Sequence, residues 1–285
     1  VGSEMCIRDR DIVGASYVRD IEPGEFVTIN ASGVHSRHFA EPRHARCIFE
    51  HVYLARPDSY LNGHSVNSTR VGIGRRLAKE HPCDGDLVIP VPESGMPAAV
   101  GYAQESGIPF AQGLTKNSYV GRTFIQPSQT IRQLGIRLKL NPLREVIRGK
   151  RLVVVDDSIV RGNTQRALVS MLREAGAAEV HVRIASPPVK WPCFYGIDFA
   201  SPAELIANGV DDTDDMLEGV RRAIGADSLG YVSQEAMVEA TGQPACEMCC
   251  ACFDGQYPIK LPPENPLVKP LLHLSLIHIS EPTRL

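Results

Sequence analysis

VVVDDSIVRGNT, residues 153–164, is the stretch that decides the fold. Its run of β-branched apolar residues is typical of a strand, yet the run ends on two adjacent aspartates. Neighbouring strand residues point to opposite faces, so Asp156 and Asp157 should not both enter a core, and an isolated buried carboxylate is costly. We therefore expect these two carboxylates to bind something at the end of the strand.

The flanking sequence alternates strand and helix patterns. Strands are predicted at residues 86–94, 108–114, 151–158 and 179–187, and helices at 66–81, 97–106 and 164–177. This alternation predicts an α/β fold with a parallel sheet flanked by helices. Residues 201–240 are predicted to be helical. Residues 115–142 are polar, basic and weakly periodic, which predicts a long mobile loop.

The loop after the two aspartates, SIVRGNT, leads directly into a predicted helix. Ligands of open α/β sheets lie at the carboxyl ends of the strands, and main-chain N–H groups before a helix provide a seat for phosphate. The loop has neither the Walker A pattern nor the glycine spacing of a dinucleotide-binding motif. A phosphate seat beside two carboxylates suits a phosphorylated sugar. The alternative without a ligand is a capped strand-to-helix turn whose aspartates are solvated.

The twelve residues resemble the signature of the type I phosphoribosyltransferases, which bind phosphoribosyl pyrophosphate (PRPP). The resemblance implies that Asp156 and Asp157 hold the ribose hydroxyls and Mg²⁺ and act as the catalytic pair. It also implies that the following loop binds the 5-phosphate through Ser158, Ile159, Val160, Arg161, Gly162, Asn163 and Thr164.

A second loop supports this interpretation. VIPVPESGMPAA, residues 88–99, reads as a strand, a short loop and a helix, and it resembles the pyrophosphate loop of the same family. The resemblance implies that Glu93, Ser94 and Gly95 contact PRPP and that Ser94 approaches Mg²⁺, which prefers few protein oxygens plus substrate phosphates. Segment 116–142 would close over PRPP and exclude water, with contacts from Lys116, Tyr119 and Arg122.

Four further stretches narrow the resemblance to the amidophosphoribosyltransferases, the glutamine PRPP amidotransferases of purine synthesis. They are CIFEHVYLARPDS (47–59), KNSYVGRTFIQPSQ (116–129), PCFYGIDFASPAELIA (192–207) and CCACFDGQYP (249–258). The family replaces the pyrophosphate of PRPP with ammonia, taken from glutamine in an N-terminal domain, and gives 5-phosphoribosylamine. It further implies homo-oligomers, usually tetramers, and feedback inhibition by purine nucleotides.

Eight cysteines are present, and four of them crowd into residues 246–252. The bacterial members of the family carry a [4Fe–4S] cluster, and the resemblance implies that its ligands here are Cys47, Cys193, Cys249 and Cys252. A Cys-x-x-Cys pair can chelate a cluster locally, while the other two thiolates must be supplied by folding. Tetrahedral zinc on the same thiolates and free buried thiols are the alternatives. Cys246 and Cys250 are spare in this interpretation.

The resemblance divides the chain. Residues 11–40 would be the last strands of a glutaminase domain, 47–240 the phosphoribosyltransferase domain and 241–263 a cysteine-rich cluster-binding tail. Residues 1–10 and 274–285 resemble vector- or adapter-derived sequence and are left out of the fold. No N-terminal cysteine nucleophile is visible, so we expect this chain to be unable to use glutamine.

Composition bounds the remaining possibilities. The net charge of −3 argues against nucleic acid as a partner, no apolar run reaches the roughly 20 residues of a membrane span, and the absence of a signal peptide predicts a cytoplasmic protein. A PRPP-sensing transcriptional regulator and a phosphoribosyltransferase acting on a purine base or orotate stay open as alternatives.

Overall fold

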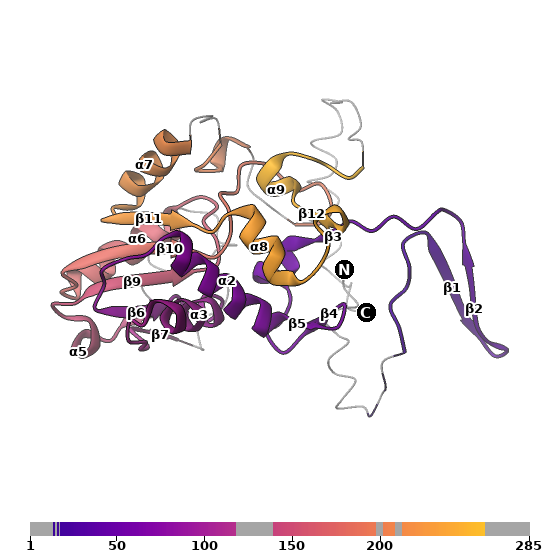
Figure 1. The fold of residues 1–285 in the computed structure, drawn as a ribbon, viewed down its shortest axis with the longest axis horizontal. Helices are drawn as coiled ribbons and strands as arrows, with labels where there is room; N and C mark the ends of the chain where they lie inside the picture. Colours follow the sequence, from indigo (N-terminus) through magenta and orange to yellow (C-terminus); the bar gives the residue numbers. More distant parts are fainter. Residues whose placement is uncertain are drawn as a thin grey trace, which may run out of the picture.

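The computed structural model describes residues 14, 16, 18–117, 139–197, 202–208 and 213–259. Its centre is a parallel sheet of four strands in the order β11-β10-β9-β6 (Figure 1). These strands are β6 (Leu87–Pro90), β9 (Arg151–Asp156), β10 (Glu179–Ile184) and β11 (Ser228–Tyr231). The sheet confirms the predicted α/β fold with parallel strands.

Alternate residues of β9 enter two different cores, one on each face of the sheet. Val153 and Val155 pack with helices α2 (Val66–Glu80), α3 (Met96–Ser106) and α8 (Gln234–Thr241). Leu152 and Val154 pack with α5 (Arg144–Ile147), α6 (Asn163–Glu174) and α7 (Thr213–Ile224). Because strand side chains alternate between faces, a strand that is apolar at every position belongs in the middle of such a three-layer structure.

Helices α2 and α3 approach each other closely through glycine. A Cβ atom on Gly74 of α2 would lie 1.9 Å from the main-chain oxygen of Ala98, and one on Gly101 of α3 would lie 2.0 Å from that of Val71. Only a residue without a side chain fits at either position. The close packing holds α3, and therefore the loop that precedes it, firmly against the sheet.

The sequence prediction was wrong for part of residues 201–240. That segment contains the short helix η3 (Pro202–Glu204), α7 and α8, but β11 lies between the two longer helices as the edge strand of the sheet. Its sequence SLGY is four residues long and includes a glycine, which weakens strand propensity. Pairing with β10, from His181↔Ser228 to Ile184↔Tyr231, makes it a strand.

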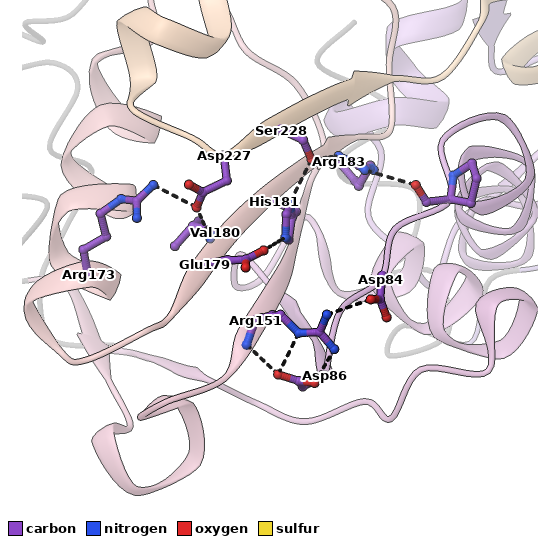
Figure 2. Close-up of polar contacts among 11 residues, drawn as sticks. Asp84, Asp86, Arg151, Arg173, Glu179, Val180, His181, Arg183, Asp227 and Ser228 are labelled. Carbon is purple, nitrogen blue, oxygen red and sulfur yellow. Dashed lines mark hydrogen bonds and ion pairs between the residues drawn. The ribbon is translucent and has the colours of Figure 1, made fainter.

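Charged side chains tie the strands together at the amino end of the sheet (Figure 2). Arg151, at the start of β9, contacts Asp84 at 2.7 Å and Asp86 at 2.9 Å. His181 of β10 lies within hydrogen-bond distance of Glu179 and of Ser228. This end of the sheet lies opposite the carboxyl ends of the strands, where the sequence predicts the ligand.

Smaller elements complete the described structure. Strands β7 (Leu114–Lys116) and β8 (Leu140–Pro142) pair antiparallel and join the two ends of the predicted long loop. Strands β4 (Tyr60–Leu61) and β5 (His64–Ser65) form a small hairpin before α2. Near the cysteine-rich end lie β3 (Arg46–Cys47), η2 (Glu50–Leu54), η4 (Ala245–Glu247), β12 (Met248–Cys249) and α9 (Ala251–Asp254).

An antiparallel hairpin of β1 (Glu25–Asn30) and β2 (Gly33–His38) projects away from the sheet (Figure 1). It confirms strands within residues 11–40, while their assignment to a glutaminase domain stays a prediction, as do the other domain boundaries. No helix in the described part of the chain is long and apolar enough to cross a membrane.

Candidate functional site

Two neighbouring strands of the sheet place both predicted loops side by side. β6 and β9 pair in parallel, so residues 91–95 and 157–162 leave the same edge of the sheet. A Cβ atom on Gly95 would lie 2.4 Å from the main-chain oxygen of Val155 and 3.1 Å from the Cα of Asp156. Glycine at position 95 therefore lets the first loop contact the end of β9 directly.

The two aspartates are both buried, with 7% and 8% of their surfaces exposed. The expectation that they could not both be buried was wrong, because β9 ends at Asp156 and strand alternation does not apply to Asp157. One carboxylate oxygen of Asp156 accepts the Asp157 N–H at 2.9 Å, and the other accepts the side-chain amide of Gln165. Asp157 accepts the Ser158 hydroxyl. Each carboxylate therefore has hydrogen-bond donors of its own.

The electrostatics of the pair favour a ligand that neutralises charge. Burial raises the pKa of Asp156 well above its usual value, and the neighbouring Asp157 carboxylate raises it further. Burial also raises the pKa of Asp157, while the Ser158 and Ser94 hydroxyls act in the opposite direction. Holding two ionised carboxylates this close is unfavourable without compensation, which a proton, a cation or hydroxyl donors at this position would supply.

The loop after the aspartates, residues 158–164, leads into the start of α6 and is called the cradle below. Gly162, at φ +74°, makes the left-handed turn into the helix, and the first N–H groups of a helix have no partner within it. The side chains of two predicted phosphate-binding residues point elsewhere. Ile159 packs in the core, and Arg161 lies 3.2 Å from Glu204. These two residues can reach a phosphate only through their main chain in this conformation.

The predicted loop residues are only partly placed. Lys116 at the end of β7 forms an ion pair with Glu93 at 2.9 Å, which joins two of the predicted PRPP contacts. Tyr119 and Arg122 lie outside the described residues. The peptide bond between Pro92 and Glu93 is cis.

All four predicted cluster ligands line one cavity of about 680 Å³, namely Cys47, Cys193, Cys249 and Cys252. Strand pairing explains part of this, because β3 and β12 align Cys47 directly with Cys249. The spare cysteines lie elsewhere: Cys250 is buried in the core and Cys246 is exposed. Folding therefore gathers residues that are far apart in the sequence, as the cluster interpretation requires.

Four thiols can serve as ligands to an iron–sulfur cluster or to a tetrahedral zinc ion, and the separation of the sulfurs differs between the two. Among the described residues, no three His, Cys, Asp or Glu side chains could share one ion, whereas tetrahedral zinc needs thiolates about 3.8 Å apart. In a cluster each thiolate binds a different iron atom, so the sulfurs stand farther apart. Burial raises the pKa of Cys47 to about 11 and also raises those of Cys249 and Cys252, and a bound metal would oppose this effect because it binds the thiolate form.

Hydrogen bonds hold Cys193 close to the other three thiols. The N–H groups of Lys190 and Trp191 donate to the Cys252 carbonyl at 3.0 and 3.1 Å. The hydroxyl of Tyr257 donates to the Pro192 carbonyl at 2.7 Å, and its ring meets Phe194 edge-on at 5.2 Å. Two segments distant in sequence are thereby fixed against each other at the cavity.

Sequence reasoning missed two residues near the aspartates. Gln165, in the first turn of α6, is 2% exposed and bonds Asp156. Arg70 of α2 is 4% exposed, donates to the His51 and Ala55 carbonyls at 2.7 Å, and is close enough to Asp157 to lower that residue's pKa. A polar residue on the buried face of an amphipathic helix was the available signal for both.

Comparison with known proteins agrees with this geometry. The phosphoribosyl transferase domain model matches residues 70–186. The amidophosphoribosyltransferase of Mycobacterium tuberculosis H37Rv is 74% identical over 259 residues, 91% of this chain and 49% of the relative. That of Bacillus subtilis is 48% identical over 92% of this chain and 54% of the relative. The chain thus spans about half the length of the curated relatives it matches.

A solved structure of the same enzyme family also matches this chain. Glutamine PRPP amidotransferase from B. subtilis, complexed with ADP and GMP, superposes with a TM-score of 0.80 at 48% sequence identity. The match covers 90% of this chain and 56% of the B. subtilis chain.

Proposed function

The chain belongs to the amidophosphoribosyltransferase family, and we propose that it carries the PRPP half of that activity: the exchange of the pyrophosphate of PRPP for ammonia, which gives 5-phosphoribosylamine and opens purine synthesis. The observation that carries the proposal is the meeting of Ser94, Asp156 and Asp157 where the β6 and β9 loops touch, beside the start of α6. A phosphoribosyltransferase domain matched over these residues supports it.

The proposed mechanism depends mainly on binding and orienting the substrate. The cradle of residues 158–164 binds the 5-phosphate through main-chain N–H groups, while Asp156 and Asp157 accept hydrogen bonds from the ribose hydroxyls. With both ends of the sugar fixed, C1 faces one direction of attack, and orientation alone lowers the barrier. The buried carboxylates also stabilise positive charge that develops on the sugar ring. No side chain acts as a covalent nucleophile.

The pyrophosphate would lie against the loop of residues 93–95. Ser94, Asp156 and Asp157 would hold Mg²⁺, which when bound neutralises the charge of the leaving group. Lys116, now paired with Glu93 at 2.9 Å, is placed to exchange that carboxylate for a phosphate oxygen. Tyr119 and Arg122 complete the proposed set of PRPP contacts from the segment that closes over the substrate.

The four thiols of the cavity would hold a [4Fe–4S] cluster. Cys249 and Cys252 chelate it locally, Cys47 is brought in by the pairing of β3 with β12, and Cys193 by the hydrogen bonds to Cys252 and Pro192. The role proposed for the cluster is structural, because it would join the C-terminal segment to the start of the phosphoribosyltransferase domain. No step of the reaction passes through it.

The remaining parts of the proposal come from the family. In the whole protein, glutamine hydrolysis in an N-terminal domain would supply the ammonia, in the cytoplasm and within a homo-oligomer such as a tetramer. Purine nucleotides would act as feedback inhibitors, and the complex of the B. subtilis relative with ADP and GMP supports this.

The test is pyrophosphate release from PRPP by the full chain in the presence of Mg²⁺, with separate additions of ammonia, glutamine, purine bases and orotate. Release with ammonia is expected. Release only with a nucleobase would contradict the proposal and favour a base phosphoribosyltransferase. Binding of PRPP without release in any arm would favour a PRPP sensor.

A further inference from the structure

Gln165 joins the two ends of the phosphate-binding loop. It is the third residue of α6, so its side chain lies in the first helical turn, immediately after the cradle. Its amide nitrogen donates to one carboxylate oxygen of Asp156, nine residues earlier and at the end of β9. The hydrogen bond is buried, since Gln165 is 2% and Asp156 7% exposed. The loop between them is therefore closed at its base by one side-chain contact.

The orientation of the Asp156 carboxylate depends on this contact. One of its oxygens accepts the main-chain N–H of Asp157 at 2.9 Å, a donor that every residue except proline would supply at that position. The other oxygen accepts the side-chain amide N–H of Gln165, and this hydrogen bond fixes the direction in which that oxygen points. Each carboxylate oxygen has two acceptor sites, so both can still receive a hydroxyl of a bound sugar.

The carbonyl end of the same amide is not satisfied. Its carbonyl oxygen is buried and has no hydrogen-bond partner in the described structure. The neighbouring buried residues of α6, Leu168 and Val169, belong to an apolar core. An unpaired buried acceptor lowers stability, and an apolar side chain of similar size would remove that acceptor. A buried side chain that leaves one polar atom unpaired while it orients a site carboxylate has the features of a functional residue.

We propose that Gln165 is a positioning residue of the PRPP site: it holds the Asp156 carboxylate, and the loop whose base it closes, in the geometry that receives the ribose hydroxyls and the 5-phosphate. The inference rests on the proposed function, because it concerns the same site. It adds a residue outside the twelve-residue motif and predicts that PRPP affinity depends on a side chain that need not touch PRPP.

The experiment compares the wild-type full chain with Gln165→Met and Gln165→Glu. Methionine keeps the length of the side chain and removes the donor, whereas glutamate keeps its shape and places a carboxylate against Asp156. The matched control is Gln234→Met, because Gln234 also donates to an aspartate, Asp254, at 3.1 Å, but on the surface and away from the site. Binding of PRPP is measured by calorimetry with Mg²⁺ present, and the melting temperature is measured without ligand.

Gln165→Met is expected to weaken PRPP binding about 10-fold, the lower end of the effect of removing a supporting hydrogen bond in a metal or ligand site. Its melting temperature should stay close to that of wild type, because the loss of the unpaired carbonyl offsets the loss of the hydrogen bond to Asp156. Gln165→Glu should bind PRPP more weakly still. In turnover with ammonia the loss should appear in KM for PRPP and leave kcat nearly unchanged, as expected for an interaction present in both the bound and transition states.

Three results would overturn the inference. The first is a Gln165→Met variant that binds PRPP with wild-type affinity. The second is a loss of PRPP affinity that only accompanies a fall in melting temperature. The third is an equal loss of PRPP affinity in the control variant Gln234→Met. If the wild-type chain itself binds no PRPP, the proposed function fails, and the inference falls with it. Because wild-type binding is measured first, the two failures are distinguishable.

Discussion

Asp86 shows how one surface-facing residue can matter at the amino end of the sheet. It accepts the main-chain N–H of Arg151 at 2.8 Å and the guanidinium at 2.9 Å (Figure 2). Asp84 contacts the same guanidinium but is 93% exposed, against 34% for Asp86. Solvent screens the exposed ion pair far more, so the two aspartates should differ in their effect on stability.

A pH-dependent difference in stability follows. Hydrogen bonds from Arg151 lower the pKa of Asp86 to about 2, below the ordinary value of about 3.9. A lowered folded-state pKa stabilises the fold above about pH 4, and this stabilisation is lost as the pH falls toward 2. Asp86→Asn should therefore lower the melting temperature at pH 7, and the difference from wild type should shrink between pH 4 and 2.

The control for this prediction is Asp84→Asn, which should have a smaller effect at pH 7. Thermal unfolding followed by circular dichroism at several pH values measures both variants. An Asp86→Asn effect that is constant from pH 7 down to pH 2 would show that the charge of Asp86 is not its cause.

At the scale of single elements, the contact of α2 with α3 makes a prediction about glycine. A side chain at Gly101 would meet the Val71 oxygen at 2.0 Å, so Gly101→Ala forces the two helices apart. We expect a loss of about 1–3 kcal/mol in the free energy of unfolding. Because α3 carries the loop of residues 91–95 at its start, PRPP binding should weaken as well.

Gly72 provides the matched control on helix α2. A Cβ atom there would find its nearest neighbour at 3.6 Å, which is ordinary contact. Gly72→Ala should therefore stabilise the protein by about 0.5–1 kcal/mol through the helix propensity of alanine. Denaturant unfolding distinguishes the two, and equal effects of the two substitutions would contradict the packing argument.

The thiol-lined cavity, formed by β3, β12 and the segment that carries Cys193, belongs to the same scale and concerns the proposed cluster. Cys193→Ser removes one of the four thiols that line the cavity, and anaerobically purified protein should lose iron, acid-labile sulfide and brown absorption. Cys83→Ser is the control, because Cys83 is half-buried outside the cavity. A wild-type chain that is colourless and contains zinc would refute the cluster proposal.

The elements nearest the motif could be predicted from sequence because their patterns are local. The strand at 151–158 and the helix at 164–177 appear as β9 and α6, with no end shifted by more than three residues. Strand β11 could not be predicted, since only its partner β10 makes SLGY extended. The positions of Cys47 and Gln165 depend likewise on tertiary contacts. Sequence similarity implied a role for the cysteine, whereas the local pattern marks Gln165 only as a polar residue on the buried face of α6.

At the scale of the whole molecule, one buried cation lies between the two candidate sites. Arg70 donates to carbonyls of residues 51 and 55, which follow Cys47 closely in the chain, and the same cation helps to lower the pKa of Asp157. The segment that enters the thiol-lined cavity and the carboxylate proposed to bind PRPP therefore share one buried guanidinium. The parallel sheet positions the carboxylate, and the C-terminal segment positions the thiols.

Phosphorus NMR of PRPP titrated with the chain in the presence of Mg²⁺ tests the central claim most directly. The account predicts that the 5-phosphate resonance and the pyrophosphate resonances all shift and saturate together, because one site holds both ends of the molecule. It predicts further that Asp157→Asn abolishes the saturation while the protein stays folded. Resonances that do not respond to the wild-type chain, or that respond equally to Asp157→Asn, would contradict it.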